Sequence, residues 1–315
     1  MANPECRGHV PVMQEEVLQL LACRSGGLYV DGTAGGGGYA EAILQRTGPN
    51  GVLLALDWDA AAIERVAERL RPYGEGVHLE RASFADLPLV LEGRGLGPVD
   101  GVVIDLGISS FQLEDPHRGF SFLHDGPLDM RMDQDLSQTA ADLVNTMAEG
   151  ELADLIFNFG EEKWARRIAR AIVERRKRRP ITGTLELAGL VAEATPKTRD
   201  SRRIHPATRT FQALRIAVNR ELEALSRFLA RILDVLKSGG RLCVVSFHSL
   251  EDRVVKDQFR TWARSCRCPQ STPVCLCGGQ PLVELLTRKP LRPTAAEVER
   301  NPRARSARLR AISKL

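Results

Sequence analysis

Apolar and polar positions in the first third of the chain predict strands and helices in succession. Apolar runs typical of buried parallel strands occupy Leu28–Val30, Val52–Asp57 and Val99–Asp105, with a weaker run at Val77–Leu79. Helical spacing of apolar residues follows several of these runs and is clearest over Ala60–Leu70. Strands that alternate with helices predict an α/β fold with a doubly wound, Rossmann-like parallel sheet.

This alternation stops after Asp105 and returns near residue 211. The intervening stretch, 110–212, has no convincing strand pattern; a polar and aromatic loop leads into helices expected near 137–158, 161–179 and 184–195. A helix from 211 to 237, a strand at Arg241–Phe247 and a helix at Leu250–Trp262 then resume the alternation. The pattern predicts an all-helical domain inserted into the sheet domain, with boundaries at 1–112, 113–212 and 213–315.

The last part of the chain predicts a different end to the sheet. Short strand patterns at Leu282–Leu286 and Ala307–Ile312 flank a basic loop that contains proline. We therefore expect the sheet to end in a hairpin-like pair and not in another strand–helix–strand unit.

A glycine-rich turn follows the first strand. The segment Asp31–Gly38 holds four consecutive glycines and leads directly into a helical pattern, an arrangement that presents backbone N–H groups to a ligand. Gly35, Gly37 and Ala40 fit the dinucleotide fingerprint loosely, and no Gly-Lys-Ser/Thr follows, which excludes a P-loop. The turn fits either a nicotinamide dinucleotide or S-adenosyl-L-methionine.

Acidic residues close three of the strands and favour the methyl donor. Asp31, Asp57 and Asp105 all stand at carboxyl ends, where ligands of such sheets bind. Asp31 suits the amino acid part of S-adenosyl-L-methionine, Asp57 its two ribose hydroxyls, and Asp105 the adenine amine or the reacting centre. The terminal strand pair also favours this donor over the dinucleotide.

The loops that follow the strands limit which kind of atom can receive the methyl group. Methylation at a ring carbon would need a cysteine nucleophile, and the loop after Asp105 has none. Asp105, Ser109, Ser110 and Gln112 offer acceptors for an N–H group. His248 follows the fifth strand and is a candidate contact for a target base or a proton acceptor.

Charge is divided along the chain. Residues 1–150 hold 10 Lys and Arg against 23 Asp and Glu, whereas 151–220 hold 16 against 8 and 221–315 hold 18 against 9. Residues 166–180 alone contain eight basic residues, and Lys197–Arg215 add six. An acidic half and a basic half predict a small-ligand site and a polyanion partner, for which RNA is the best candidate.

Composition favours an ordinary globular protein. The sequence has no apolar run of membrane-spanning length and no signal-peptide pattern at its start, so we expect a cytoplasmic protein that does not contact a membrane. The cysteines cluster at Cys266, Cys268, Cys275 and Cys277, and four thiolates could bind a structural zinc ion. Their Cys-x-Cys spacing is tighter than the usual Cys-x-x-Cys, so free cysteines are the favoured interpretation and no metal ligand is assigned.

Several longer segments resemble the bacterial 16S rRNA (cytosine-N4)-methyltransferase H family, also called MraW. The matching segments are His9–Met13, Asp31–Gly38, Asp105–Asp115, Arg118–Phe122, Asp125–Asp133, Arg203–Arg215, Ser246–Arg253, Arg288–Pro290 and Asn301–Ala307. The resemblance implies a class I methyltransferase fold and S-adenosyl-L-methionine-dependent N4 methylation of a cytidine, position 1402, in the decoding region of the small-subunit rRNA.

The resemblance also implies site residues. The family's cofactor positions fall on Gly37, Gly38, Tyr39, Asp57, Phe84, Asp105 and Gln112. Two positions depart from the family pattern, because Gly36 stands where an arginine is usual and Tyr39 where a histidine is usual. The imidazole is dispensable if the turn contacts the cofactor through its backbone.

Two other functions remain open at this point. An NAD-dependent oxidoreductase could use the same sheet, and an RNA-binding assembly factor could retain the cofactor pocket without turnover. Binding of labelled methyl donor against NAD distinguishes the first, and turnover on small ribosomal subunits distinguishes the second.

Overall fold

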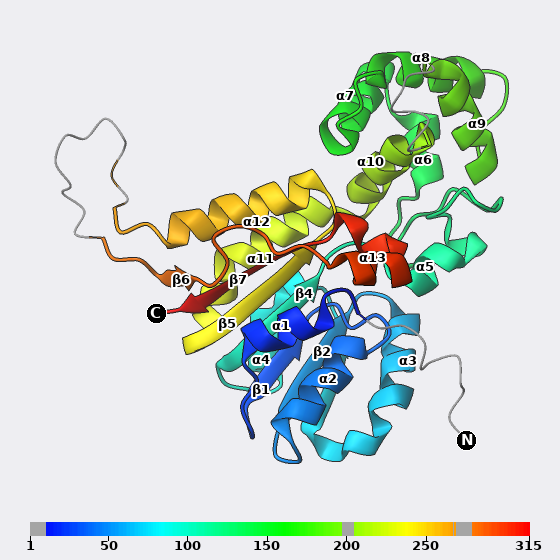
Figure 1. Cartoon of the computed structure of the whole chain (residues 1–315). Coiled ribbons are helices and arrows are strands. Elements are labelled where there is room, and N and C mark those ends of the chain that lie inside the picture. Colours follow the sequence, from blue (N-terminus) through cyan, green and yellow to red (C-terminus); the bar gives the residue numbers. More distant parts are fainter. Residues whose placement is uncertain (1–10, 197–204, 267, 269–278) are drawn as a thin grey trace. The chain divides into compact units, whose positions relative to one another are not determined.

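The structure is a computed structural model, shown in Figure 1, and it describes residues 11–196, 205–266, 268 and 279–315. The chain divides into two compact units, Met1–Gly107 with Leu222–Leu315 and, inserted between them, Ile108–Glu221. The insertion expected at 113–212 lies inside the second unit, which begins earlier and ends later.

The first unit contains one sheet. Its strands lie in the order β3-β2-β1-β4-β5-β7-β6. The parallel strands are β1 (Leu28–Asp31), β2 (Val52–Asp57), β3 (Val77–Arg81), β4 (Val99–Asp105) and β5 (Leu236–Ser246). All five expected parallel strands are therefore confirmed, and for β2 and β4 the reason is that long buried apolar runs have few alternatives to a central strand.

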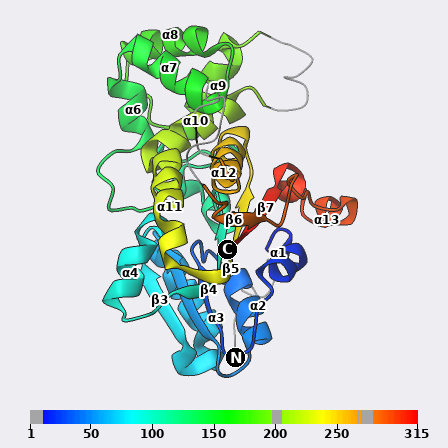
Figure 2. The same cartoon turned by 90° about the vertical axis from the view of Figure 1, so that its left-hand side faces the viewer.

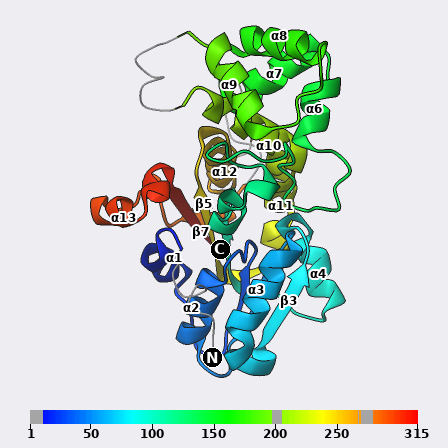
Figure 3. The ribbon, with the colours of Figure 1, turned by 90° about the vertical axis from the view of Figure 1, so that its right-hand side faces the viewer.

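Helices cover both faces of this sheet. The helices α1 (Gln14–Leu21), α2 (Gly38–Thr47) and α3 (Ala60–Leu70) share one apolar core with the strands, and α4 (Leu87–Gly93), α11 (Glu221–Val235) and α12 (Ser249–Trp262) share the other. Figures 2 and 3 show α1 and α2 on one side of the strands and α4 on the opposite side. This is the doubly wound arrangement that the strand–helix alternation predicts.

The sheet ends as the sequence predicts. Strand β7 (Arg308–Lys314) is antiparallel to both β5 and β6 (Val283–Leu285). The connection between β6 and β7 carries the helix α13 (Ala295–Arg300) and the short 3₁₀ helix η6 (Pro302–Ser306). Because β7 is antiparallel to β5, the first residue of β7 lies beside the last residue of β5. The connection therefore enters β7 at the edge of the sheet where β5 ends.

The second unit is helical. Its helices are α5 (Ser110–Glu114), η4 (Pro116–Arg118), α6 (Ala140–Thr146), α7 (Glu149–Gly160), α8 (Ala165–Arg176), α9 (Thr184–Ala194) and α10 (Ala207–Asn219). The single helix expected over 137–158 is wrong, since Met147 is extended and separates α6 from α7. The helix expected over 211–237 is wrong as well: Arg220 has φ 48° and divides it into α10 and α11.

Two further expectations depend on which residues are described. No helix in the described ranges is long and apolar enough to cross a membrane. Cys266 and Cys268 are described, whereas Cys275 and Cys277 lie outside the described residues, and so do residues 197–204 of the basic stretch.

Candidate functional site

The turn after β1 is tightly packed, and two of its glycines show why the sequence needs them. A Cβ on Gly32 would lie 2.4 Å from Cδ1 of Ile104 and 3.1 Å from Cβ of Phe84, so a larger residue would have to displace these side chains. Gly37 has φ 78°, in the left-handed region, and begins α2 as its N-cap. These constraints fix the path of the backbone from the strand into the helix.

Two of the strand-end acids hold this turn together. The Asp31 carboxylate accepts from the backbone N–H of Thr33 (3.2 Å) and of Ala40 (3.1 Å). Asp57 accepts from the N–H of Gly35 (2.8 Å) and of Asp59 (2.9 Å). Burial raises the pKa of Asp31 to about 7 and that of Asp57 to about 6, despite these hydrogen bonds. Asp57 thus lies against the turn, with lone pairs left for a second donor.

Asp105 differs from the other two acids. Its backbone N–H donates to Oγ1 of Thr33 (2.7 Å), but its side-chain Oδ1 is buried without a hydrogen-bond partner among the described residues. Burial, with the charges of Asp31 and Glu251, raises its pKa well above the ordinary value. A buried carboxyl oxygen without a donor is costly, and a ligand N–H group or cation would satisfy it.

The start of α2 offers backbone donors. Gly38 and Tyr39 are its first two residues, whose N–H groups have no acceptor within the helix. The next two N–H groups are taken, that of Ala40 by Asp31 and that of Glu41 by the Gly37 carbonyl (2.9 Å). Two donors and the positive helix end therefore face the space beyond β1, a favourable place for a carboxylate.

The Tyr39 side chain belongs to the apolar core of the first unit. It is buried, and its hydroxyl donates to the Val12 carbonyl, which ties α2 to the segment before α1. Burial is the main cause of its strongly raised pKa. The aromatic ring is therefore a core residue, and we expect any contact of Tyr39 with a ligand at the turn to come from its backbone.

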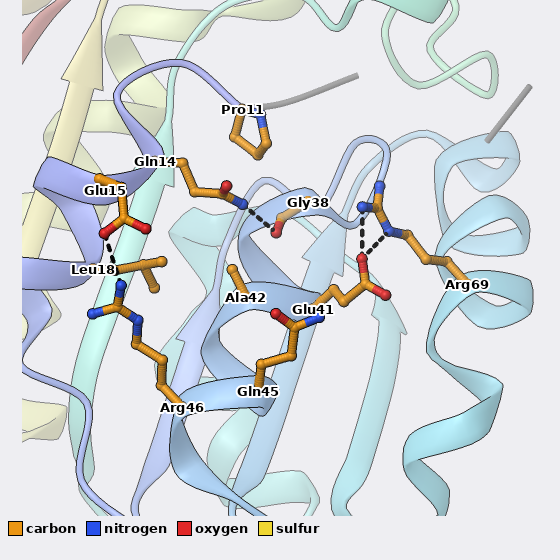
Figure 4. A pocket seen from close by; sticks show the side chains of 10 residues that line it. All are labelled: Pro11, Gln14, Glu15, Leu18, Gly38, Glu41, Ala42, Gln45, Arg46 and Arg69. Atoms are coloured by element: carbon orange, nitrogen blue, oxygen red, sulfur yellow. Dashed lines mark hydrogen bonds and ion pairs between the residues drawn. The ribbon is translucent and has the colours of Figure 1, made fainter. Parts of the chain in front are cut away.

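A pocket of about 260 Å³ lies on the outer side of the same turn, as Figure 4 shows. Arg69 reaches across it, donates to the Gly36 carbonyl (2.8 Å) and forms an ion pair with Glu41 (2.7 Å). Gln14 donates to the Gly38 carbonyl (3.0 Å). Arg69 and Gln14 thus bind backbone carbonyl groups of the turn and stabilise its conformation.

Thr33 and Arg69 are contributors that sequence reasoning missed. The hydroxyl of Thr33 links the turn to β4, and the guanidinium of Arg69 links it to α3. Thr33 lies inside the conspicuous Asp31–Gly38 segment, so its position was a usable signal. Arg69 carries no such signal, because its role depends on how α3 packs beside α2.

Phe84 and Gln112 have structural roles in their own units. Phe84 is buried and packs edge-on against Trp58 (5.8 Å between ring centroids) and Phe228 (5.4 Å). In the second unit, Gln112 forms a capping box with Ser109 at the start of α5. Phe84 lies among the residues that follow β3, at the same sheet edge as the acids, while Gln112 belongs to a separate unit.

His248 begins α12. Its Nδ1 accepts from the backbone N–H of Glu251 (3.4 Å), and its Nε2 lies 3.0 Å from a Glu251 carboxylate oxygen. The Glu251 carboxylate also accepts from the N–H of Phe247 (2.9 Å). With Nδ1 engaged as a helix cap, His248 positions the loop after β5, and its proposed contact with a base stays a prediction.

The basic stretch of the second unit divides into two groups. Arg175 pairs with Glu186, and Arg176 donates to the carbonyls of Val144 (2.7 Å) and Met147 (2.6 Å), so these two arginines hold the unit together. The exposed members are Arg166, Arg167, Arg170, Lys177, Arg178 and Arg179. This exposed group is the surface that could face a polyanion.

Strand order and site together define the class of protein. A sheet ordered 3-2-1-4-5-7-6 with antiparallel β7, a glycine turn after β1 and acids ending β1, β2 and β4 is the class I, S-adenosyl-L-methionine-dependent methyltransferase arrangement. The chain belongs to the MraW methylase family, whose model matches residues 7–315. The choice between dinucleotide and methyl donor is thereby decided for S-adenosyl-L-methionine.

Two curated relatives support this assignment. The chain is 66% identical to the ribosomal RNA small subunit methyltransferase H of Syntrophobacter fumaroxidans, over 97% of this chain and 96% of the relative. It is 53% identical to the protein of the same name from Geotalea uraniireducens, over 98% of both. A solved rRNA methylase from Streptococcus thermophilus matches with a TM-score of 0.39 and 12% identity, over 96% of this chain and 93% of that one.

Proposed function

We propose that the protein transfers a methyl group from S-adenosyl-L-methionine to the exocyclic N4 amine of a cytidine in small-subunit ribosomal RNA, at position 1402 of the decoding region. The curated relatives named above support the RNA, since their names specify the small ribosomal subunit. The choice of N4 and of the nucleotide rests on the family resemblance of the sequence segments. The observation that carries the chemistry is the buried Oδ1 of Asp105.

The described residues fit the donor. The N–H groups of Gly38 and Tyr39 suit its carboxylate, and Gly37 keeps the turn open for this approach. Asp57 suits the ribose hydroxyls, because each of its oxygens keeps a lone pair. Asp105 supplies an acceptor for an ammonium or amine group. Phe84 and Gln112 complete the set on the strength of the resemblance.

The reaction is an in-line displacement. The bound donor supplies an electrophilic methyl group on a sulfonium. The N4 lone pair forms the new N–C bond as the C–S bond breaks, S-adenosylhomocysteine leaves with the electron pair, and the amine then loses one proton. Asp105 lies at the end of β4 and would accept a hydrogen bond from the amine and orient its lone pair. The proton can pass to Asp105 or to water.

Positive charge on the second unit would bind the RNA backbone. Its exposed basic residues can neutralise phosphates, and their contribution should depend steeply on salt. Arg166, Arg167 and Arg178 are suitable for substitution because they are exposed, whereas Arg175 and Arg176 are structural. Replacing the first three with glutamine should weaken RNA binding without unfolding the unit.

Mass spectrometry of the RNA tests this function. Small ribosomal subunits from cells that lack the gene are incubated with the protein and labelled donor, then digested to nucleosides and to mapped fragments. We expect one N4-methylcytidine to appear, and Asp105→Asn to lower kcat by at least tenfold. Label on cytosine C5, on another nucleotide or on no RNA would refute the proposed reaction.

A further inference from the structure

We propose that the connection between β6 and β7, residues 286–307, is a second RNA-binding surface, located on the methyltransferase unit itself. The inference rests on the proposed function, because it assigns an additional contact to the same substrate. The connection is called the basic rim below. It carries Arg288, Lys289, Arg292, Arg300, Arg303 and Arg305 against Glu297 and Glu299, and all six basic residues are exposed.

The topology places the basic rim at the reacting edge of the sheet. Arg308, the first residue of β7, pairs with Ser246, the last residue of β5. Parallel β4 and β5 end together, since Asp105 pairs with Val245. The rim therefore enters β7 at the edge where Asp105 lies. A polyanion bound there would lie beside the donor.

The basic rim is held in a defined conformation. Leu291 and Leu309 exchange backbone hydrogen bonds (2.9 and 3.0 Å), and Ala304 and Ala307 are buried in the core beneath α1 and α2. Thr294 caps α13, and Asn301 caps η6. A segment whose backbone is already fixed loses little backbone entropy when its side chains bind a ligand.

Contacts with neighbouring elements also anchor the rim. Glu297 accepts from the backbone N–H of Met13 (2.6 Å), which joins α13 to the start of α1. At the other end, Asp252 receives hydrogen bonds from Arg308 (2.9 Å) and Arg310 (2.6 Å). The arginines of β7 and the acid at the start of α13 thus help to hold the rim in place.

A hollow beside the rim has room for a nucleotide base. Its volume is about 780 Å³, and its lining includes Arg300, Arg303 and Glu297 on the rim and Glu15 and Glu16 on the α1 side. The acids on the α1 side would repel a phosphate inside the hollow. A neutral base can use the mixed lining, while its phosphates stay on the outer arginines. This combination suits single-stranded RNA next to the target cytidine.

Paired variants of the full-length protein test the surface. The rim variant combines Arg292→Gln, Arg300→Gln and Arg305→Gln. The control variant combines Arg24→Gln, Arg71→Gln and Arg231→Gln, which removes the same charge from exposed positions. The first two of these precede β1 and β3 and so lie at the opposite edge of the sheet. Both variants should bind the methyl donor as the unmodified protein does.

Binding of a short labelled single-stranded RNA that contains the target cytidine is measured over a range of salt concentrations. For the rim variant we expect affinity to fall roughly tenfold and the salt slope to fall by up to about 2, at about 0.7 for each lost phosphate contact. Photo-crosslinking of the same RNA carrying 4-thiouridine beside the target should label a peptide within 293–303. Equal salt slopes for the two variants, or crosslinks confined to other peptides, would overturn the proposal.

The test separates this surface from the proposed reaction. If the unmodified protein methylates cytidine N4 but the rim and control variants bind RNA equally, the proposed RNA binding by the rim is wrong and the proposed function is kept. If the rim variant loses RNA affinity but the unmodified protein methylates another atom, the function is wrong and the surface stands. Loss of affinity for anionic lipid vesicles, with RNA affinity kept, would assign the rim to a membrane instead.

Discussion

The backbone N–H of Asp105 donates to Oγ1 of Thr33 over 2.7 Å, so the carboxyl end of β4 is hydrogen-bonded to the turn that follows β1. A second link joins the same elements, since the N–H of Gly32 donates to the Val103 carbonyl (2.9 Å). The position of Asp105 therefore depends on the glycine turn, and in the proposed function the donor site and the reacting centre are joined by these hydrogen bonds.

The first prediction concerns Thr33→Val, which keeps the shape of the side chain and removes the acceptor for the Asp105 N–H. An unsatisfied buried donor costs about 1–3 kcal/mol, so the free energy of unfolding should fall by that order. Donor affinity should fall too, because the end of β4 is less well fixed. Denaturant unfolding and calorimetric titration with the donor measure the two effects.

Thr33→Ser is the matched control because it retains the hydroxyl. It should keep most of the stability and the donor affinity of the unmodified protein. If Thr33→Val and Thr33→Ser behave alike in both measurements, the hydrogen bond to Asp105 does not support the site.

The second prediction concerns Asp57→Ala. Its carboxylate accepts from Gly35 and Asp59, and in the proposed complex it also accepts from the ribose hydroxyls. Loss of hydrogen bonds to a charged group costs about 1.5–3 kcal/mol, so we expect donor affinity to fall by roughly tenfold or more. Calorimetric titration gives the affinity directly.

Asp100→Ala provides the comparison on the same sheet. Asp100 accepts from the N–H of Leu28 (2.9 Å) and from Lys237 (2.7 Å) near the start of β4, at the opposite end of that strand from Asp105. Its loss should lower stability and leave donor affinity unchanged. Unchanged affinity in Asp57→Ala as well would remove Asp57 from the donor site.

The third prediction is a pH dependence of stability. Burial raises the pKa of Asp57 to about 6, whereas the unfolded chain releases this proton near pH 4. Between these values the folded protein binds more protons than the unfolded chain, so the contribution of Asp57 to stability falls as the pH rises from 4 to 6. The loss is about 1.4 kcal/mol for each unit by which the pKa is raised.

Comparison with Asp57→Asn isolates this contribution from all other titrating groups. Denaturant unfolding at several pH values gives the free energy of each protein. We expect the stability of the unmodified protein, measured relative to Asp57→Asn, to decline between pH 4 and 6 and then level off. A constant difference, or one that grows with pH, would show that burial does not destabilise the ionised form of the Asp57 carboxyl group.

Much of the first unit could be predicted because its signals are local. The strand that ends at Asp57 and the one that ends at Asp105 are nearly all apolar. This pattern predicts both that they are strands and that they are buried in the middle of the sheet. Their terminal acids are then placed at one edge by parallel geometry alone. Asp31, Asp57 and Asp105 are brought together as the sequence predicted, although the first two mainly bind backbone N–H groups.

Other features depend on contacts between distant parts of the chain. The break at Arg220 occurs within a continuous helical pattern, and the sequence offers no glycine or proline to mark it. The roles of Arg175 and Arg176 follow from the packing of α8 against α6 and α9. A count of basic residues could not separate these internal arginines from the exposed ones.

The last prediction concerns Tyr39, which stands where the family resemblance implies a histidine. Its hydroxyl donates to the Val12 carbonyl, and its backbone N–H lies at the open end of α2. Tyr39→Phe should therefore lower the free energy of unfolding by about 1–2 kcal/mol, since a buried carbonyl loses its donor. Donor affinity should change by less than about threefold, because the backbone is kept.

Two further substitutions at this turn complete the comparison. Tyr39→His restores the family residue and should bind the donor no more tightly, even though it too loses the phenol. Gly37→Ala strains the backbone, since it places a Cβ at φ 78°, and it also brings this Cβ to 3.1 Å from the Arg69 side chain. It should weaken donor binding far more than either change at Tyr39. If Tyr39→His tightens binding by tenfold, the imidazole contacts the donor and the backbone explanation is wrong.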